Sequence, residues 1–167
     1  MDLRELQAPL KERYREAPES ARITLSARGD QSDVPIACSV DLGRAVYDAQ
    51  AHVGVGGAGT AACSGDLLLG ALAACAQITC QMVAASMGLS PRSISVKVDG
   101  DLDLRGTLGL DRDVTAGFTD IRVAFSVDCP DATDDQIRGL LERTERYCTV
   151  MRTLVAPPPI KVDWVRP

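Results

Sequence analysis

Residues Ser64 to Met87, with the sequence SGDLLLGALAACAQITCQMVAASM, decide how this chain folds. Ser64 is a suitable N-cap, Asp66 places an acid in the first turn, and Gly88 is a C-terminal stop. These signals predict a helix from about Gly65 to Met87, which is about 35 Å long at 1.5 Å per residue. Its first half is apolar on every side, so it has to be covered all round.

The length of the chain limits what can cover this helix. A chain of 167 residues is expected to form one compact domain, in which one sheet covers only one flank. The other flank needs a second helix or another subunit, so we expect a dimer. The apolar run from Leu67 to Ala76 is broken at Gln77 and Gln81 and is shorter than the roughly 20 residues that cross a bilayer. We therefore expect a buried helix and no membrane partner.

The rest of the chain predicts shorter elements around the long helix. Alternation of apolar and polar residues and turn signals predict a first strand, the turn Arg28-Gly29-Asp30 and a second strand that ends in a tight turn at 41–44. The glycine-rich residues 53–60 and residues 105–119 are expected to be loops, the former mobile. The predicted strands are 22–27, 34–42, 93–103, 121–127 and 160–164, and the predicted shorter helices are 8–17 and one that starts at 133–135. This order of elements indicates an α+β fold.

Composition excludes several classes of function. The chain has 18 Lys and Arg against 23 Asp and Glu, a net charge of −5 that does not suit a nucleic-acid partner. Hydrophobic residues at 46% and charged residues at 25% are typical of a globular domain. The first five residues do not resemble a secretory signal, so the cytoplasm is the expected location.

Six cysteines, at positions 38, 63, 75, 80, 129 and 148, are the main candidates for chemistry. None has CxxC spacing, and in a reducing compartment cysteines are more often free, catalytic or metal-bound than disulfide-bonded. Cys75 lies on an apolar helix face, where it is either a buried apolar side chain or a reactive thiol that needs a nearby cation. Cys80 lies about 140° round the helix from Cys75 and is expected to pack.

The remaining cysteines differ in what surrounds them. Cys148 follows a helical stripe of apolar residues and has Arg146 and Arg152 nearby in the sequence. It is either a thiolate that these cations favour or another core cysteine. Cys63 precedes the long helix, where the helix dipole would stabilise a thiolate. Cys38 and Cys129 carry no signal of chemistry. The lone histidine, His52, supports neither a catalytic triad nor a typical zinc site.

Residues 64–75 resemble the central-helix signature of the OsmC/Ohr superfamily, in which a cysteine follows a run of small residues. Three further stretches match the family in order and spacing: GDLDLRG at 100–106, GFTDI at 117–121 and ERYC at 145–148. The resemblance covers about Ala21 to Val165. It divides the chain into an N-terminal helical extension, residues 1–20, and an OsmC-like domain, residues 21–167.

The resemblance implies an α+β fold with antiparallel sheets around a long buried central helix, in an intertwined homodimer with active sites at the interface. It also implies reduction of organic hydroperoxides by a cysteine pair. The thiolate at the position of Cys75 attacks the peroxide and becomes a sulfenic acid, and the cysteine at the position of Cys148 condenses with it into a disulfide. A dithiol reductant, dihydrolipoyl groups in some members, restores the pair. No metal or flavin cofactor is implied. The apolar face around Cys75 suits a small apolar hydroperoxide.

Two positions depart from the family pattern, and the position of the family's arginine aligns loosely. Family members hold the thiolate with an arginine from the N-terminal hairpin and a glutamate ten residues before the cysteine, and Gly65 stands at the acidic position. For the arginine, Arg28 is the closest match by location, with Arg22 and Arg44 as competitors. Asp66 is half a turn out of phase and is not assigned the role. The family's Cys-Pro is Cys148-Thr149 here.

These departures leave three hypotheses open. The leading one is a thiol-dependent peroxidase. The second is an OsmC-like ligand-binding or structural dimer that has lost efficient peroxidase chemistry. The third is a redox sensor that forms the Cys75–Cys148 disulfide stoichiometrically without sustained turnover.

Overall fold

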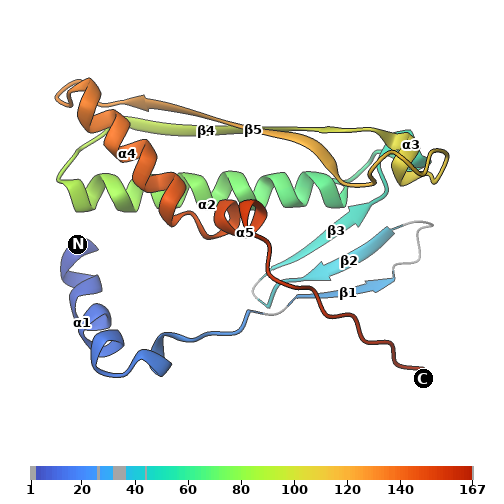
Figure 1. Cartoon of the computed structure of the whole chain (residues 1–167), viewed down its shortest axis with the longest axis horizontal. Coiled ribbons are helices and arrows are strands. Elements are labelled where there is room, and N and C mark those ends of the chain that lie inside the picture. Colours follow the sequence, from blue (N-terminus) through green and yellow to red (C-terminus); the bar gives the residue numbers. More distant parts are fainter. Residues whose placement is uncertain (1–2, 26, 32–36, 44, 167) are drawn as a thin grey trace. The chain divides into compact units, whose positions relative to one another are not determined.

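The computed structural model describes residues 3–25, 27–31, 37–43 and 45–166 (Figure 1). The chain divides into two compact units. Unit 1 comprises residues 1–70 and 97–124, and unit 2 comprises residues 71–96 and 125–167. Helix α2 (Ser64–Met87) and strands β4 (Ser93–Leu102) and β5 (Phe118–Asp128) each contribute residues to both units.

The N-terminal residues of unit 1 form α1 (Leu3–Glu16) and a 3-10 helix, η1 (Pro18–Ala21). The predicted polar helix is present but begins earlier than expected. Pro9 therefore lies inside α1 rather than in its first turn. Because proline has no N–H, the helix lacks one backbone hydrogen bond at this position.

A three-stranded antiparallel sheet follows, with the order β1 (Arg28–Gln31), β2 (Ala37–Asp41) and β3 (Val46–Gln50). The prediction of a strand at 22–27 and a turn at Arg28-Gly29-Asp30 is wrong, because Arg28 pairs with Asp41 and Asp30 with Ser39. Residues 32–36, which connect the two strands, lie outside the described residues. The tight turn predicted at 41–44 is confirmed for its described residues, 41–43, by Gly43 at φ +81° and by the Leu42 N–H, which donates to the Ala45 carbonyl.

The glycine-rich segment after β3 contains a short 3-10 turn, η2 (Val53–Val55), which the expectation of a loop missed. Nδ1 of His52 caps this turn by accepting a hydrogen bond from the Gly54 N–H at 3.0 Å. The Gln50 amide donates to the Thr60 hydroxyl at 2.8 Å and ties the two ends of the segment together. Its expected mobility stays a prediction.

The ends of the predicted central helix are confirmed to within one residue. The carbonyl of Cys63 accepts from the Leu67 N–H, and Asp66 accepts from the Cys63 N–H at 2.9 Å, so the N-cap is Cys63 rather than Ser64. Gly88, at φ +74°, ends the helix as predicted. By length and mean hydropathy alone, α2 could cross a membrane, contrary to the expectation that its apolar stretch is too short. Its buried residues instead give it one core-facing side: Leu72, Ala76, Cys80, Val83 and Ala84.

Strands β4 and β5 pair as a two-stranded ribbon. Arg92, just before β4, donates its N–H to Asp128 at the end of β5, and Thr119 near the start of β5 donates its hydroxyl to the Asp101 carbonyl near the end of β4, so the pair is antiparallel. Gly100 allows this pairing to be close, since a Cβ there would lie 2.6 Å from the Phe118 ring. The predicted strands at 93–103 and 121–127 are therefore confirmed.

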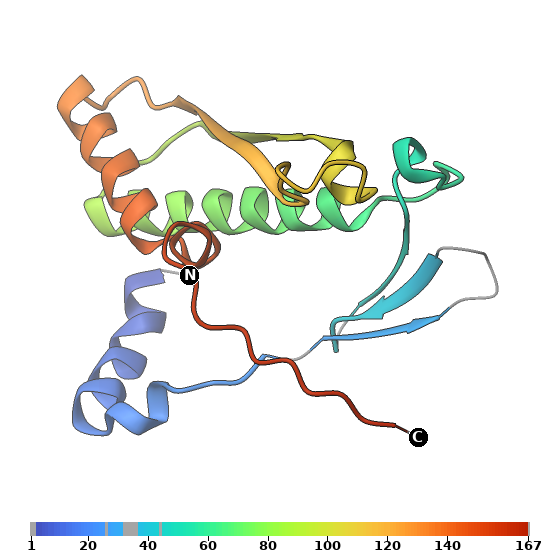
Figure 2. The same ribbon diagram turned by 45° about the vertical axis from the view of Figure 1, so that its right-hand side comes forward.

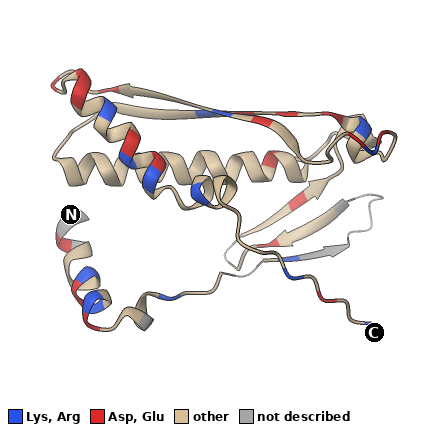
Figure 3. Cartoon of the chain, in the orientation of Figure 1, with Lys and Arg blue, Asp and Glu red and all other residues tan. Residues whose placement is uncertain are grey.

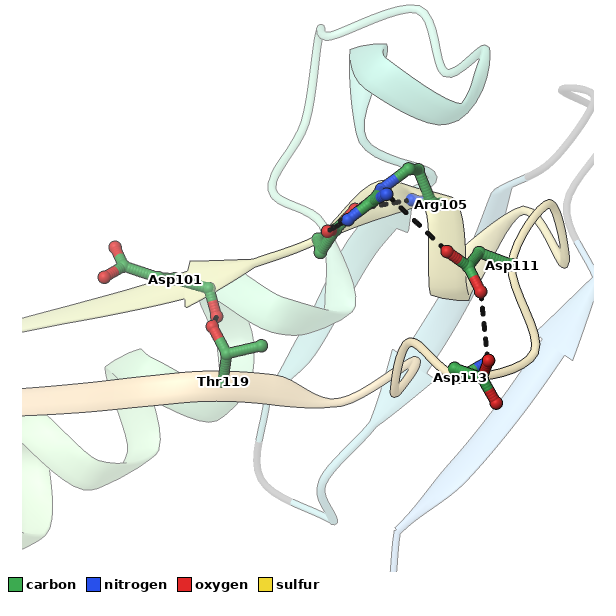
Figure 4. A network of polar contacts seen from close by, with 6 residues as sticks. Asp101, Arg105, Asp111, Asp113 and Thr119 are labelled. Atoms are coloured by element: carbon green, nitrogen blue, oxygen red, sulfur yellow. Dashed lines mark hydrogen bonds and ion pairs between the residues drawn. The ribbon is translucent and has the colours of Figure 1, made fainter.

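The connection between β4 and β5 contains a short helix, α3 (Leu104–Thr107), and a polar network (Figure 4). Arg105 forms ion pairs with Asp103 and Asp111. Asp111 also accepts from the Asp113 N–H at 3.1 Å. These contacts give order to residues that were expected to be a loop.

The hydrophobic core of unit 2 lies between the second half of α2 and α4 (Asp134–Tyr147), which Figures 1 and 2 both show beside α2. The fully buried Cys80 and Leu140 are at its centre. The predicted start of α4 is confirmed by a capping box in which Thr133 and Gln136 cap each other. Helix α4 ends before Cys148, and a second helix, α5 (Thr149–Val155), begins directly after it. The sequence pattern did not predict α5.

The closing strand predicted at 160–164 is wrong. These residues have no regular structure, and Ile160, Val162 and Trp164 are each more than 80% exposed. An alternating segment becomes a strand only where another strand offers an edge, and none of the described strands pairs with this one.

Candidate active site

The candidate site in unit 2 is built around Cys75, in the middle of α2. Its side chain is half-buried, so it remains open to solvent. Thr79 lies one turn further along the same face, and its Oγ1 is 4.0 Å from the Cys75 sulfur. The only charged residue in α2 is Asp66 in the first turn, so the helix itself supplies no charge beside Cys75 (Figure 3).

Cys148 reaches the same site from the junction between α4 and α5. It is the C-cap of α4 and the N-cap of α5, with an extended backbone at φ −69° and ψ 106°. Its side chain is fully buried, and its thiol lies close enough to that of Cys75 for each to shift the pKa of the other. The structure therefore brings these two predicted residues together, and both thiols are free.

The pKa of the Cys75 thiol is lowered. Burial disfavours its thiolate, but hydrogen bonds from the Val150 N–H, the Cys148 thiol, the Thr79 hydroxyl and the Thr149 N–H together outweigh this effect. Within the described residues, neutral donors therefore stabilise the thiolate, and the cation that the sequence argument called for stays a prediction.

The pKa of the Cys148 thiol is raised. Burial is the main cause, and the Cys75 sulfur adds to it because it accepts the Cys148 proton and repels a second negative charge. The expectation that Arg146 and Arg152 favour a Cys148 thiolate is therefore wrong. The guanidinium of Arg146 lies over the Tyr147 ring, 5.6 Å from its centroid.

Comparison with known protein families supplies the context for this pair. Residues 57–163 match the model of the family described as OsmC-like protein. This chain belongs to the OsmC-like protein family. The resemblance to the OsmC/Ohr superfamily is thereby confirmed, and the match includes both Cys75 and Cys148.

Solved structures show the OsmC-like fold. The OsmC-like protein from Mycoplasma pneumoniae superposes with a TM-score of 0.69 at 14% identity, covering 81% of this chain and 89% of that one. The organic hydroperoxide resistance protein OsmC from Legionella pneumophila gives 0.61 at 16% identity, covering 81% and 92%. The organic hydroperoxide resistance protein OhrB of Bacillus subtilis gives 0.52 at 18% identity, covering 81% and 93%. A search of curated protein sequences found no significant match.

The arginine and acidic positions of the OsmC-like pattern lie in unit 1. Arg28 is exposed in β1, Arg22 is exposed before it, and Arg44 is outside the described residues. The choice of Arg28 as the residue that faces Cys75 stays a prediction. Gly65 lies in the first turn of α2, and the carboxylate of Asp66 is held by the Cys63 N–H and thiol, which lower its pKa.

The other cysteines of this OsmC-like chain are not part of the pair. Cys80 is fully buried in the core, as expected, and burial raises the pKa of its thiol. Cys38, Cys63 and Cys129 are half-buried and free. In the described ranges, no three His, Cys, Asp or Glu side chains are placed to hold a metal ion.

The donors around Cys75 are what the sequence argument missed. Thr79 had a signal, because a residue four positions after a cysteine shares its helix face. The N–H groups of Thr149 and Val150 had none, because they become available only through the helix break at Cys148.

Proposed function

We propose that this protein is a thiol-dependent peroxidase of the cytoplasm that reduces organic hydroperoxides, with Cys75 as the attacking thiolate and Cys148 as the resolving thiol. One observation carries the proposal. Two thiols that influence each other have pKa values shifted in opposite directions, and the one with the lowered pKa is the one open to solvent. A peroxide arriving from solvent therefore meets the thiolate first.

The first step oxidises Cys75. Its thiolate attacks the terminal peroxide oxygen, the S–O bond forms as the O–O bond breaks, and the leaving alkoxide takes up a proton to become an alcohol. Cys75 is left as a sulfenic acid. The donors that stabilise the thiolate, the Thr79 hydroxyl and the N–H groups of Thr149 and Val150, hold the sulfur in place for this attack.

The second step uses the buried neighbour. Cys148, as its thiolate, attacks the Cys75 sulfur, so that an S–S bond forms and the S–O bond breaks. The departing hydroxide leaves as water with the proton that Cys148 releases. A dithiol, for which dihydrolipoyl groups are our candidate, then reduces the disulfide in two exchange steps and is itself oxidised to a disulfide. No metal or flavin takes part in this sequence.

Apolar hydroperoxides are the substrate class that suits the site. Around Cys75, Leu72 and Ala76 are buried, and Ile78 and Met82 are exposed apolar side chains of the same helix. The names of the solved relatives from Legionella pneumophila and Bacillus subtilis point to organic hydroperoxides as well.

A homodimer is the assembly that we propose for this peroxidase. Only 28% of the most apolar window of α2 is buried within the chain, and Ile78 is 56% exposed. Such a helix needs a partner to remove its apolar surface from water. Light scattering after size-exclusion chromatography should give twice the 17.7 kDa of one chain, whereas the mass of one chain at micromolar concentration would contradict the dimer.

Peroxide consumption with purified variants tests the function. Native protein with dihydrolipoamide should consume cumene hydroperoxide over many turnovers, Cys75→Ser should show only the background rate, and Cys148→Ser should lose most of the turnover. Cys129→Ser is the matched control, because Cys129 is a half-buried cysteine of the same unit and should not affect the rate.

Other outcomes of this assay select the other hypotheses. Hydrogen peroxide consumed much faster than cumene hydroperoxide would contradict the substrate class. A Cys75–Cys148 disulfide formed once, with no turnover, would indicate a redox sensor. No thiol-dependent consumption by a stable protein would favour the ligand-binding or structural dimer.

A further inference from the structure

A hydroxyl interrupts the buried face of α4. Among the buried side chains that the structure describes, that of Thr144 is the only polar one other than cysteine. Leu140, one turn before Thr144, and Cys148, one turn after it, are fully buried as well. Residues four positions apart share one face of a helix, so these three side chains form a single buried stripe that ends at the Cys148 thiol.

This stripe faces the second half of α2, which lies beside α4 in Figures 1 and 2. Leu140 belongs to one core cluster with Cys80 of α2. The Thr144 side chain is close enough to Cys80 to lower the pKa of that thiol, against the larger effect of burial, which raises it. Cys148 is close enough to Cys75 to affect its pKa in the same way. The two helices are therefore antiparallel, with Thr144 opposite Cys80 and Cys148 opposite Cys75.

Thr144 also holds the last turn of α4 through hydrogen bonds. Its hydroxyl donates to the Leu140 carbonyl at 2.8 Å, and its own carbonyl accepts from the Cys148 N–H at 2.9 Å. A threonine hydroxyl that bonds back to the carbonyl four residues earlier often bends a helix. The Cys148 carbonyl in turn accepts from the Arg152 N–H at 2.9 Å, which starts α5. Thr144 therefore shapes the turn that carries Cys148.

We propose that Thr144 is a positioning residue for the cysteine pair: beside Cys80 of α2, it fixes the turn of α4 that brings the Cys148 thiol to the Cys75 sulfur. This inference rests on the proposed function, in which Cys148 resolves the sulfenic acid of Cys75. Thr144 acts only through Cys148 and touches no reacting atom. Its hydroxyl is retained in an apolar core because it is hydrogen-bonded there and sets the geometry of the helix end.

Equilibration of the full chain with glutathione measures this positioning without any peroxide. Glutathione disulfide oxidises the two thiols to the Cys75–Cys148 disulfide and is itself reduced to two molecules of glutathione. The equilibrium constant, read by peptide mass spectrometry, rises with how well the folded chain places the two sulfurs. Because a misplacement of about 1 Å can cost as much as 10²-fold, we expect Thr144→Val to lower the constant about tenfold. Thr144→Ser, which retains the hydroxyl, should restore most of the native value.

Cys80→Ala tests the same contact from the side of α2 and keeps the proposal testable if Thr144→Val fails to fold. It should also lower the glutathione constant, about threefold to tenfold. Val83→Ala is the matched control, because Val83 lies in the same core cluster, one turn further from Cys75 than Cys80 does. Val83→Ala should lower the free energy of unfolding in urea and leave the glutathione constant unchanged.

The pKa of Cys75 gives a second readout, which a loss of stability alone would not change. The groups that lower this pKa include the Cys148 thiol and the N–H groups of Thr149 and Val150, which all follow Thr144 in the chain. If Thr144→Val displaces them, the Cys75 pKa rises, as measured by the pH dependence of alkylation by iodoacetamide.

Three outcomes would overturn the proposal. The first is a native glutathione constant together with a native Cys75 pKa in Thr144→Val. The second is a loss in Val83→Ala as large as that in Thr144→Val and Cys80→Ala, because the effect would then be general loosening of the core. The third is a native protein that forms no Cys75–Cys148 disulfide with glutathione, which would overturn the proposed function as well.

Discussion

Burial separates Cys75 from Cys148: Cys75 is half-buried and has a lowered pKa, whereas Cys148 is fully buried and has a raised one. Each thiol contributes to the pKa shift of the other. In the mechanism that we propose, Cys75 is the thiolate that a peroxide reaches, and Cys148 is the protected neighbour that resolves it. The proposed order of reaction follows from burial and hydrogen bonding alone.

Alkylation by iodoacetamide should reveal this order as a function of pH. Because the pKa of Cys75 is lowered, its alkylation should reach half its maximal rate at a lower pH than that of an ordinary thiol. Because the pKa of Cys148 is raised, its alkylation should need a higher pH and proceed slowly. Peptide mass spectrometry after short exposures between pH 5 and 10 measures both. Alkylation of Cys148 at a lower pH than Cys75 would contradict the assignment.

Thr149 should assist Cys75 through its backbone N–H and not through its exposed side chain. Thr149→Pro removes this N–H at the first position of α5, where proline is tolerated, and the extended ψ of 106° at Cys148 suits a following proline. This N–H is the weakest of the donors to Cys75, so losing about 0.5 kcal/mol should raise the Cys75 pKa and slow its reaction at pH 7 about twofold. Thr149→Ala retains the N–H and should react as the native protein does. Equal rates for the two variants would exclude this role.

The Thr79 hydroxyl should have an effect on the same thiolate at least as large as that of the Thr149 N–H, because it lowers the Cys75 pKa more. Its Oγ1 is 4.0 Å from the Cys75 sulfur, which is a long contact even for sulfur. Thr79→Val retains the shape and removes the hydroxyl, and we expect the pKa of Cys75 to rise with a loss of reactivity of about twofold to threefold. Thr79→Ser should restore the native pKa. An unchanged pKa in Thr79→Val would remove this residue from the account.

Gly100 should be required for the stability of unit 1. A Cβ at this position would lie 2.6 Å from the Phe118 ring and 3.1 Å from Leu69, so Gly100→Ala forces the ring to move and should cost about 1–3 kcal/mol. Gly117→Ala is the control, because its Cβ would meet only the Thr115 hydroxyl at 3.7 Å. Urea unfolding measures the free energies of both variants. Similar losses for the two would mean that contact with Phe118 is not the cause.

The sequence predicted those parts of the fold that depend on local signals. The ends of α2 follow from residues at its own termini, and the alternation of β4 and β5 matches strands that pair with each other. The errors concern segments whose structure depends on pairing. Residues 22–27 alternate as clearly as a strand does, but the register of β2 places Arg28–Gln31 opposite it instead. Residues 160–164 alternate too, and no described strand offers them an edge.

The candidate site was predictable to a similar extent. Cys75 and Cys148 lie on different elements, so their spacing carries no information, and their pairing came from the family resemblance. The sequence argument called for a cation near Cys75, which stays a prediction, and it missed the backbone N–H groups that become available at the helix break at Cys148. Arg146 illustrates the opposite error, since nearness in sequence placed it beside Cys148 but its guanidinium lies over Tyr147.

The most direct test of the cysteine pair is the oxidation of reduced protein by one equivalent of cumene hydroperoxide, without reductant, followed by acid quenching and peptide mass spectrometry. The account predicts about one Cys75–Cys148 disulfide per chain, and in Cys148→Ser a sulfenic acid at Cys75 that dimedone traps. A sulfenic acid trapped at Cys148 instead, or oxidation at Cys38, Cys63 or Cys129 with Cys75 left reduced, would contradict it.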